Sequence, residues 1–380
     1  MHYRTRIVAN VSIDLQRHTV RQASAAASRS AWIDRLRVGL TCLVIFHHAA
    51  ITYGASGSWF FRATEEISVP LTFLAAVNQA FFMGLFFLVS GYLAPRSLDR
   101  KGPAAFLKDR AVRLGLPVLL FGFLLGPLTV AIAQEPLVRI WGRTVAEIMD
   151  GTFILGPLWF PAALLVFSVG LALLPRTMHA PRPIPGFLSW LALALVTGVL
   201  ALLIRQAVPV GATVLGFQLG YFASYVVLFA LGVTAGRNDW LEALPRRGIL
   251  LSLAVGAAAL PVLPMALLST DDPAFETGLS LAAIVYAFWE PLVALGAIAG
   301  LIALSRRPGL VSARARTRAA ANSYGAFILH APILVATSRA LDAFGLSNGP
   351  ALIVSVTATV TIAFVVTDVL RRSPLIRRVI

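Results

Sequence analysis

The 380-residue sequence is poor in charge and in cysteine, and both shortages narrow what the protein can be. Charged residues make up 13% of the chain against 58% hydrophobic residues, and the mean hydropathy is +0.81. That balance excludes an ordinary soluble domain and is typical of a membrane protein with several spans. The single cysteine, Cys42, excludes a disulfide framework within the chain.

The sequence also lacks the short motifs that mark common cofactor and metal sites. No Walker loop, GxGxxG fingerprint, zinc-ligand spacing or GxSxG elbow stands where it could work. We therefore expect no metal, no redox cofactor and no tightly bound cofactor of another kind. No internal repeat and no long soluble segment is present either, which predicts one membrane domain.

What the sequence does have is a series of apolar segments, each about 20 residues long and so able to cross the hydrocarbon core as a helix. There are ten of them, over residues 35–54, 72–94, 114–134, 154–174, 187–206, 213–235, 249–269, 278–304, 320–341 and 350–370. The sequence thus predicts an all-α, polytopic membrane protein of about ten transmembrane helices.

Acidic residues are outnumbered by basic ones, 17 to 32, and the basic residues are unevenly placed. All but five of them lie in alternate gaps between the spans, at residues 1–37, 95–113, 175–186, 236–248, 305–319 and 371–380. The positive-inside rule then predicts that both termini are cytosolic, in a multi-pass protein of the cell inner (plasma) membrane. Because the net charge of +15 is mostly an orientation signal, we expect no nucleic-acid partner.

The ends of the chain differ from the membrane domain that we expect over residues 32–372. Residues 1–31 are polar and nearly free of acids, and they lack the apolar core of a cleavable signal peptide. We interpret them as a disordered cytosolic tail, with a transit peptide as the alternative. Residues 373–380 are expected to form a short cytosolic tail.

The first span places a cation in line with a histidine. Arg37 and His48 are eleven positions apart, which at about 100° per residue is three helical turns plus about 20°. Both side chains therefore project from the same face of the helix, about 16 Å apart along its axis. An ionisable group at mid-bilayer usually faces a protein interior or a wet cavity. We interpret His48 as a proton acceptor, with a hydrogen bond to a neighbouring helix as the plainer reading. His47, about 100° round the helix, is expected to orient His48, line the cavity or pack.

His330 and Glu290 are the other ionisable groups predicted near mid-depth. His330 lies close to Pro332, whose missing N–H leaves a backbone carbonyl free, a common feature of cavities in membranes. Glu290 precedes Pro291, and a carboxylate at that depth must form an ion pair, be protonated or be hydrated by water in a cavity. It could orient an imidazole or bind a polar acceptor, or it could simply pair with an arginine, and the sequence leaves both open. The catalytic candidates are His48, Glu290 and His330.

Further candidates lie at the expected cytosolic ends of the second and third spans. Arg110 and Arg113 are three residues apart, about one helical turn, which suits a phosphate clamp as well as ordinary topology control. The Ser-Gly-Tyr tripeptide at the end of span two offers hydroxyls, although its small residues also suit close helix packing. The candidate ligand-binding residues are Arg37, Ser90, Gly91, Tyr92, Arg110 and Arg113.

Together these motifs resemble the membrane-bound acyltransferase 3 family, over almost the whole chain from Asp34 to the last helix. The family's Asp, Arg and His of the first span are matched by Asp34, Arg37 and His48, and its Phe-Phe-x-x-Ser-Gly-Tyr by residues 86–92. Further matches are its Arg-x-x-Arg and Pro at Arg110, Arg113 and Pro117, its Leu-Trp-Phe segment at Leu158, Trp159 and Phe160, and its late Ser-Tyr and His at Ser323, Tyr324 and His330. Taken alone, the segment 158–160 is most simply an interfacial aromatic anchor.

The resemblance implies transfer of a short acyl group, often acetyl, from acyl-CoA to a hydroxyl group. The expected partners are acyl-CoA (acetyl-CoA above all) as co-substrate, a hydroxyl-bearing acceptor that is a glycan, a lipid-linked sugar or a small molecule, and membrane lipids. A neutral His48 imidazole could take the acceptor's proton, and the arginines could hold the donor's phosphates. The alternative is a proton-coupled transporter or exporter of a polar small molecule, which mid-depth His and Glu residues also suit.

Overall fold

The computed structural model describes residues 31–174, 181–270, 274–309 and 311–380. The tail predicted over residues 1–31 lies outside this range except for its last residue. The described residues form helices joined by loops, with one isolated bridge between Val214 and Phe217 and no β-strand. The all-α prediction is confirmed.

Nine helical runs of the described residues are long and apolar enough to cross a membrane. They are α2 (Val69–Lys101), Pro103–Gln134, Gly156–Leu173, α8 (Phe187–Ala207), Leu219–Asn238, Arg246–Leu268, α12 (Leu281–Arg306), α13 (Ala313–Ala343) and α14 (Asn348–Leu370). Each overlaps one expected span, which confirms a multi-pass membrane protein. The first expected span corresponds to a helix over residues 31–52 that is not among the nine, because two arginines and two histidines make it less apolar.

Four of these runs are built from shorter helices. Their parts are α3 (Pro103–Arg110), η1 (Ala111–Gly115), α4 (Leu116–Leu120), η2 (Phe121–Leu125) and α5 (Gly126–Gln134), then η3 (Gly156–Leu158) and α7 (Trp159–Leu173), η4 (Leu219–Tyr221) and α9 (Phe222–Asn238), and α10 (Arg246–Ala259) and α11 (Val262–Leu268). The elements η1 and η2 are π-helical, and such wider turns are often found at functional sites.

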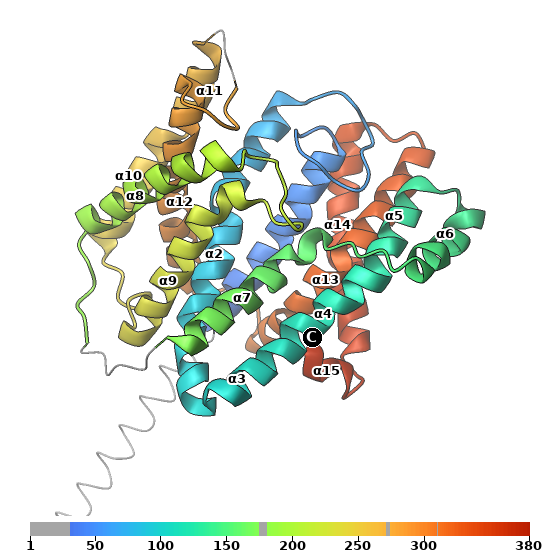
Figure 1. The fold of residues 1–380 in the computed structure, drawn as a ribbon, viewed down its shortest axis with the longest axis horizontal. Helices are drawn as coiled ribbons and strands as arrows, with labels where there is room; N and C mark the ends of the chain where they lie inside the picture. The colour runs from blue at the N-terminus through green and yellow to red at the C-terminus, as the bar shows by residue number, and fades with distance from the viewer. Residues whose placement is uncertain (1–30, 175–180, 271–273, 310) are drawn as a thin grey trace, which may run out of the picture.

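The helix over residues 31–52 and α2 lie near the centre of the bundle, with the other helices grouped on either side (Figure 1). On one side α9 and α12 pack along α2, and α8 and α10 pack on α12. On the other side α13 packs between α14 and α5. This arrangement brings residues from the first and the ninth expected span, far apart in the sequence, into one interior.

Glycines allow α2 and α9 to pack with their backbones in contact. A Cβ atom at Gly91 would overlap the carbonyl oxygen of Phe229, and one at Gly232 would overlap that of Leu88. Further along, a Cβ at Gly236 would overlap the Tyr92 carbonyl. Small residues that admit such close approach are a usual means of helix association in membranes.

The two ends of the bundle differ in charge. The segments 95–113, 236–248, 305–309, 311–319 and 371–380 gather at one end, which we call the basic end (Figure 1). The segments 53–68, 135–155, 208–221, 269–270 and 274–280 gather at the other (Figure 1). We call it the acidic end because Glu65, Glu66 and Glu276 lie there. The positive-inside rule makes the basic end the predicted cytosolic one.

Two short helices were not expected from the sequence. One is α15 (Ile376–Val379), within the predicted C-terminal tail. The other is α6 (Leu137–Met149), which exposes Leu137, Val138, Trp141 and Met149 by 73% or more, a pattern typical of a helix that lies along a membrane surface.

Just beyond the membrane spans, hydrogen bonds from Thr152 and Arg143 hold the pKa of the Glu147 carboxyl below its usual value.

The interpretation of residues 158–160 as an interfacial anchor is wrong. Leu158 is 0% exposed and Phe160 is 6% exposed, so neither side chain reaches a membrane surface. The Trp159 ring stacks on Tyr225 with centroids 5.3 Å apart and contacts Phe87. The segment belongs to an aromatic cluster in the interior, where the η3–α7 turn places it beside α2 and α9.

Candidate active site

His48 and His330 contact each other directly in the interior of the bundle. Nδ1 of His48 lies 3.0 Å from Nε2 of His330, and the two rings stack with centroids 5.1 Å apart and planes 18° apart. His330 is fully buried in α13, whereas His48, on the helix over residues 31–52, is half-buried. The two histidines proposed from the sequence therefore form one pair, although 282 positions separate them along the chain.

The hydrogen bonds of His330 determine which nitrogens carry protons when both rings are neutral. Its Nδ1 lies 2.5 Å from the carbonyl oxygen of Phe327, and a carbonyl can only accept, so Nδ1 is the donor. Nε2 of His330 is then an acceptor, and Nδ1 of His48 must donate to it. That leaves Nε2 of His48 without a proton, in the form that a general base needs.

Trp59 holds the ring of His48 from the acidic end. Its ring stacks on His48 with centroids 3.8 Å apart and planes 17° apart, and it lies 5.9 Å from the ring of His330. The loop that carries Trp59 is itself fastened, because Nη1 of Arg62 donates to the carbonyls of Ala55 and Gly57, at 3.1 Å each. Stacking against a fastened tryptophan limits rotation of the His48 imidazole.

A cavity of about 540 Å³ reaches the adjacent histidines from the acidic end, and we call it the histidine cavity. His47 and His48 both line it, together with residues 56–58, 210–211 and 275–276 of the acidic-end loops. Its volume is within the range of small-molecule sites. His330 is not among the residues described as lining it, so the histidine cavity meets His48 and has His330 behind it.

The wall of the histidine cavity is aromatic and largely uncharged. Tyr221, Tyr225 and Tyr286 line it, and the side-chain amide of Gln79 donates to the Tyr225 hydroxyl at 3.1 Å. Among the described lining residues there is no Lys or Arg, and the one carboxylate is that of Glu276. Such a wall suits a neutral molecule with several hydroxyl groups better than an anion.

Comparison with protein families decides the class of protein. A model of an acyltransferase domain matches residues 30–368, nearly the whole described chain. The chain belongs to the acyltransferase 3 family. It is therefore an enzyme, an acyltransferase embedded in a membrane by several passes. Searches of curated proteins and of solved structures return no match.

At the basic end of the acyltransferase, the structure brings two of the predicted donor-binding residues together. The guanidinium of Arg37 interacts electrostatically with those of Arg113 and Arg371 and with the Asp34 carboxylate. Nε of Arg113 also lies 3.3 Å from Asp109. Arg371 also interacts with Asp368 and Arg377, and Lys101 pairs with Asp109. These cations outnumber the carboxylates Asp34, Asp109 and Asp368, and the excess of positive charge favours an anionic ligand.

Arg110 has a different environment from Arg113. It ends α3, whereas Arg113 lies in η1, and in a π-helical turn residues three apart no longer stand directly above one another. The guanidinium carbon of Arg110 lies 5.0 Å from the Phe106 ring centre, and its Nε is buried without a hydrogen bond to any described residue. Arg110 and Arg113 therefore do not lie on one regular α-helical turn, although their guanidiniums still interact electrostatically.

The Ser-Gly-Tyr tripeptide of the acyltransferase mainly makes contacts between helices. Gly91 allows the close packing of α2 on α9, and the Tyr92 hydroxyl lies 3.3 Å from Asp239 and 3.4 Å from Glu242. The hydroxyl of Ser90 is half-buried and forms no hydrogen bond with any described residue. Of the three, Ser90 is the one whose polar group is left available to a ligand.

Glu290 pairs with Arg205 of α8, and neither histidine is among its described hydrogen-bond partners. The two residues are 4% and 2% exposed. Arg205 also donates from Nε to the Gly220 carbonyl at 3.1 Å, and its guanidinium carbon lies 4.7 Å from the Tyr286 ring centre and 5.7 Å from that of Tyr221. Because both tyrosines line the histidine cavity, the pair supports the cavity wall.

We expect Arg205→Met to destabilise the protein by roughly 3–5 kcal/mol, because it leaves the Glu290 carboxylate buried without its partner. Arg205→Met/Glu290→Gln should recover much of that loss, and a double-mutant cycle of thermal unfolding midpoints in detergent measures the coupling. If Glu290→Gln abolishes acyl transfer at an unchanged unfolding midpoint, Glu290 acts in the chemistry and not through the wall.

Sequence reasoning missed several residues of the acyltransferase site, among them the tyrosines of the cavity wall, Trp59, Arg371 and Arg205. Trp59 lies in a loop, where no periodic pattern points to it. Arg371 was counted only as part of a basic tail. Arg205 had a usable signal, because a cation inside an apolar span needs a partner and Glu290 is a carboxylate within another span.

Proposed function

We propose that this acyltransferase moves a short acyl group, acetyl above all, from acyl-CoA to a hydroxyl group of a sugar, a glycan or a small molecule. The observation that carries the proposal is that His48 lies in the wall of the histidine cavity while its Nδ1 bonds to His330. An imidazole held in that tautomer can receive a proton from an acceptor bound in the cavity.

In the proposed reaction, the acceptor oxygen attacks the thioester carbonyl carbon while Nε2 of His48 takes the hydroxyl proton. The carbon–sulfur bond then breaks, and the departing CoA thiolate takes the proton back from His48. The products are the ester and free CoA, and both histidines return to their neutral state. His330 stabilises the transient imidazolium because the hydrogen bond from Nδ1 of His48 strengthens when its donor is charged.

The donor is proposed to bind at the basic end, with its phosphates held by Arg37, Arg113 and Arg110. The excess positive charge of the cluster that includes Arg371 supports this assignment. Ser90, with a free hydroxyl, and the neighbouring Gly91 and Tyr92 would border the same region. Acyl-CoA is cytosolic, which agrees with a cytosolic basic end in the cell inner membrane.

The acceptor is proposed to occupy the histidine cavity. Its tyrosines and glutamines can exchange hydrogen bonds with hydroxyl groups, and its aromatic rings can pack on the apolar faces of a sugar. Glu290 would contribute by way of Arg205, which holds Tyr221 and Tyr286 in place.

Release of free thiol from acyl-CoA by the purified protein tests the proposal. Thiol release that depends on a sugar or other polyhydroxyl acceptor is the expected result, with the acyl ester detected on the acceptor by mass spectrometry. A proton-coupled transporter needs no thioester cleavage. No thiol release with any hydroxyl acceptor, from protein that is folded by its unfolding midpoint, would reject the acyl-CoA part of the proposal.

We expect Arg37→Ala and Arg113→Ala each to weaken acyl-CoA binding by about tenfold, with a clear dependence on salt, because each removes a phosphate contact. The corresponding lysine variants should recover charge without the paired geometry and so restore only part of the affinity. Equilibrium binding of a non-hydrolysable acyl-CoA analogue measures this, with exposed Arg314→Ala at the same end as the matched control. Unchanged affinity in Arg110→Ala and Arg113→Ala would mean that those arginines only set the topology.

A further inference from the structure

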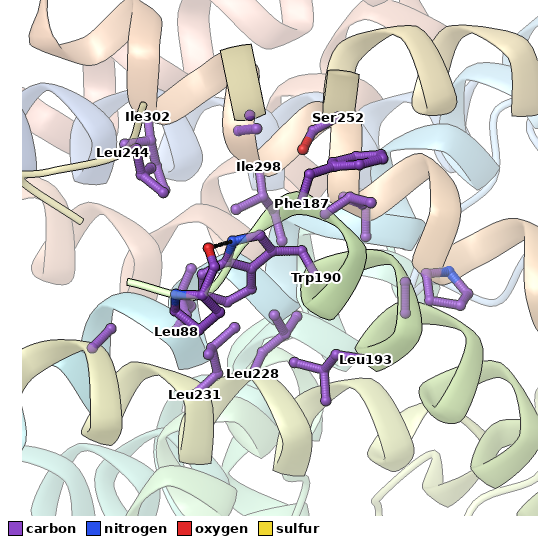
Figure 2. Close-up of a pocket in the computed structure, with 18 of the residues that line it drawn as sticks. Leu88, Phe187, Trp190, Leu193, Leu228, Leu231, Leu244, Ser252, Ile298 and Ile302 are labelled. Carbon is purple, nitrogen blue, oxygen red and sulfur yellow. Dashed lines mark hydrogen bonds between the residues drawn. The ribbon is translucent and has the colours of Figure 1, made fainter. Parts of the chain in front are cut away.

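A second cavity, of about 120 Å³, lies between α2, α8, α9, α10 and α12, and we call it the lateral cavity. Figure 2 shows the Trp190 ring at its centre, with Leu228 and Leu231 on one side and Phe187 and Ile298 on another. The lateral cavity shares no lining residue with the histidine cavity. It is therefore separate from the proposed reaction site.

The walls of the lateral cavity are mostly apolar, and the hydroxyls of Ser224 and Ser252 are also among the described lining groups. Nε1 of Trp190 donates to the Pro185 carbonyl at 3.0 Å, and the Thr197 hydroxyl donates to the Leu193 carbonyl at 2.7 Å, so these polar groups are already bonded within the protein. The described lining contains no Lys, Arg, Asp, Glu or His. A polar ligand would find few hydrogen-bond partners there to replace its hydration, whereas an alkyl chain needs none.

The helices on the outer side of the lateral cavity lie at the edge of the bundle. Only 22% of the most apolar 18-residue stretch of α8 is buried inside the protein, and only 28% of that in the run Arg246–Leu268. The corresponding share in the central helix α2 is 61%. These helices thus face the hydrocarbon of the bilayer with most of their surface. The lateral cavity between them and α12 therefore lies on the side of the bundle that we expect to face lipid.

Two arginines stand at the basic end of the lateral cavity. Leu244 and Pro245 line the cavity, and Arg246 and Arg247 follow directly as the first residues of α10. Both arginines are exposed, and neither has an ion pair or a side-chain hydrogen bond with any described residue. Adjacent cations at the cytosolic surface of a membrane attract anionic headgroups.

We propose that the lateral cavity binds an anionic glycerophospholipid of the cytosolic leaflet, with part of one acyl chain between α8, α10 and α12 and the phosphate at Arg246 and Arg247. The apolar lining selects the chain, and the charge at its basic end selects the headgroup. The chain of the acyl donor is not the occupant, because the thioester must reach His48 and the lateral cavity does not. The bound lipid would hold the peripheral helices α8 and α10 against α12.

Native mass spectrometry of the full chain tests this, after delipidation in detergent and addition of phosphatidylglycerol, phosphatidylcholine or a polyisoprenyl phosphate. The expected result is one retained phosphatidylglycerol, at least about tenfold preferred over phosphatidylcholine, since two cations face the headgroup. Arg246→Gln/Arg247→Gln should abolish the preference, and Ala194→Trp, which fills the cavity, should abolish retention. The matched controls are Arg307→Gln/Arg314→Gln at the same end and Ala192→Trp on the exposed face of the same helix, and both should behave as wild type.

Equal retention of the two phospholipids, or a preference that survives Arg246→Gln/Arg247→Gln, would overturn the proposal. Stronger retention of the polyisoprenyl phosphate would also overturn it, in favour of a different lipid. Retention by Ala194→Trp equal to wild type would place the lipid elsewhere. If Ala194→Trp does not fold, the lipid preference of the Arg246→Gln/Arg247→Gln variant tests the proposal by itself. The readout needs no acyl transfer, so its result is independent of the proposed function.

Discussion

Replacing His48 with alanine is expected to lower acyl transfer by about 10²-fold or more while leaving the protein inserted and folded. His48 lines the histidine cavity, and its Nδ1 is hydrogen-bonded to the His330 imidazole. No other described residue combines these two properties, so the variant removes the proposed general base. Thiol release from acyl-CoA in the presence of acceptor measures the rate. Because the base acts in the transition state, kcat and kcat/KM should fall together.

The neighbouring histidines are matched controls for this prediction. His47→Ala should cost much less, because the His47 ring packs beside Phe82 with centroids 4.9 Å apart and is not bonded to His330. His330→Ala should fall between the two, because it removes the acceptor that holds the His48 tautomer. Near-normal activity in well-folded His48→Ala protein would refute the role, and a larger loss in His47→Ala would transfer it to His47.

The membrane architecture could be predicted from sequence because a bilayer demands apolar segments of nearly constant length. The expected span 187–206 differs from α8 by one residue at its end. Other spans were predicted too short, since α2 continues to Lys101 and α13 begins at Ala313, in polar residues that hydropathy does not count. The π-helical turns η1 and η2 have no hydropathy signal at all, which is why the geometry of Arg110 and Arg113 was not predictable.

Only those features of the candidate site that lie within a single helix could be predicted from the sequence. The spacing of Arg37 and His48 is a property of a single helix, so their common face followed from the residue count. The contact between His48 and His330 depends on how two distant helices pack, which no spacing in the sequence encodes. For the same reason the sequence left the partner of Glu290 open, and packing supplied Arg205.

The second large effect concerns the two faces of the membrane, and it is expected to be nearly all-or-none. The arginine cluster of Arg37 and Arg113 lies at the basic end, whereas the histidine cavity is lined by loops of the acidic end. Arg37 and His48 are about 16 Å apart along their helix, so a donor bound at one end can present its thioester to an acceptor that arrives from the other. In sealed vesicles of known orientation, acyl-CoA should react only from the basic-end face, and product should form only with acceptor on the opposite face.

Orientation is established independently by labelling single cysteines in a Cys42→Ser background. Arg100→Cys, exposed at the basic end, should react with an impermeant reagent from the cytosolic side, and Leu215→Cys, at a position that is 89% exposed at the acidic end, should react from the other side. With orientation known, equal product when both substrates are supplied on the basic-end face would reject transfer across the bilayer while leaving acyl transfer intact. A strict requirement for opposite faces would mean that the acyl group crosses the membrane by reacting at His48, without movement of CoA.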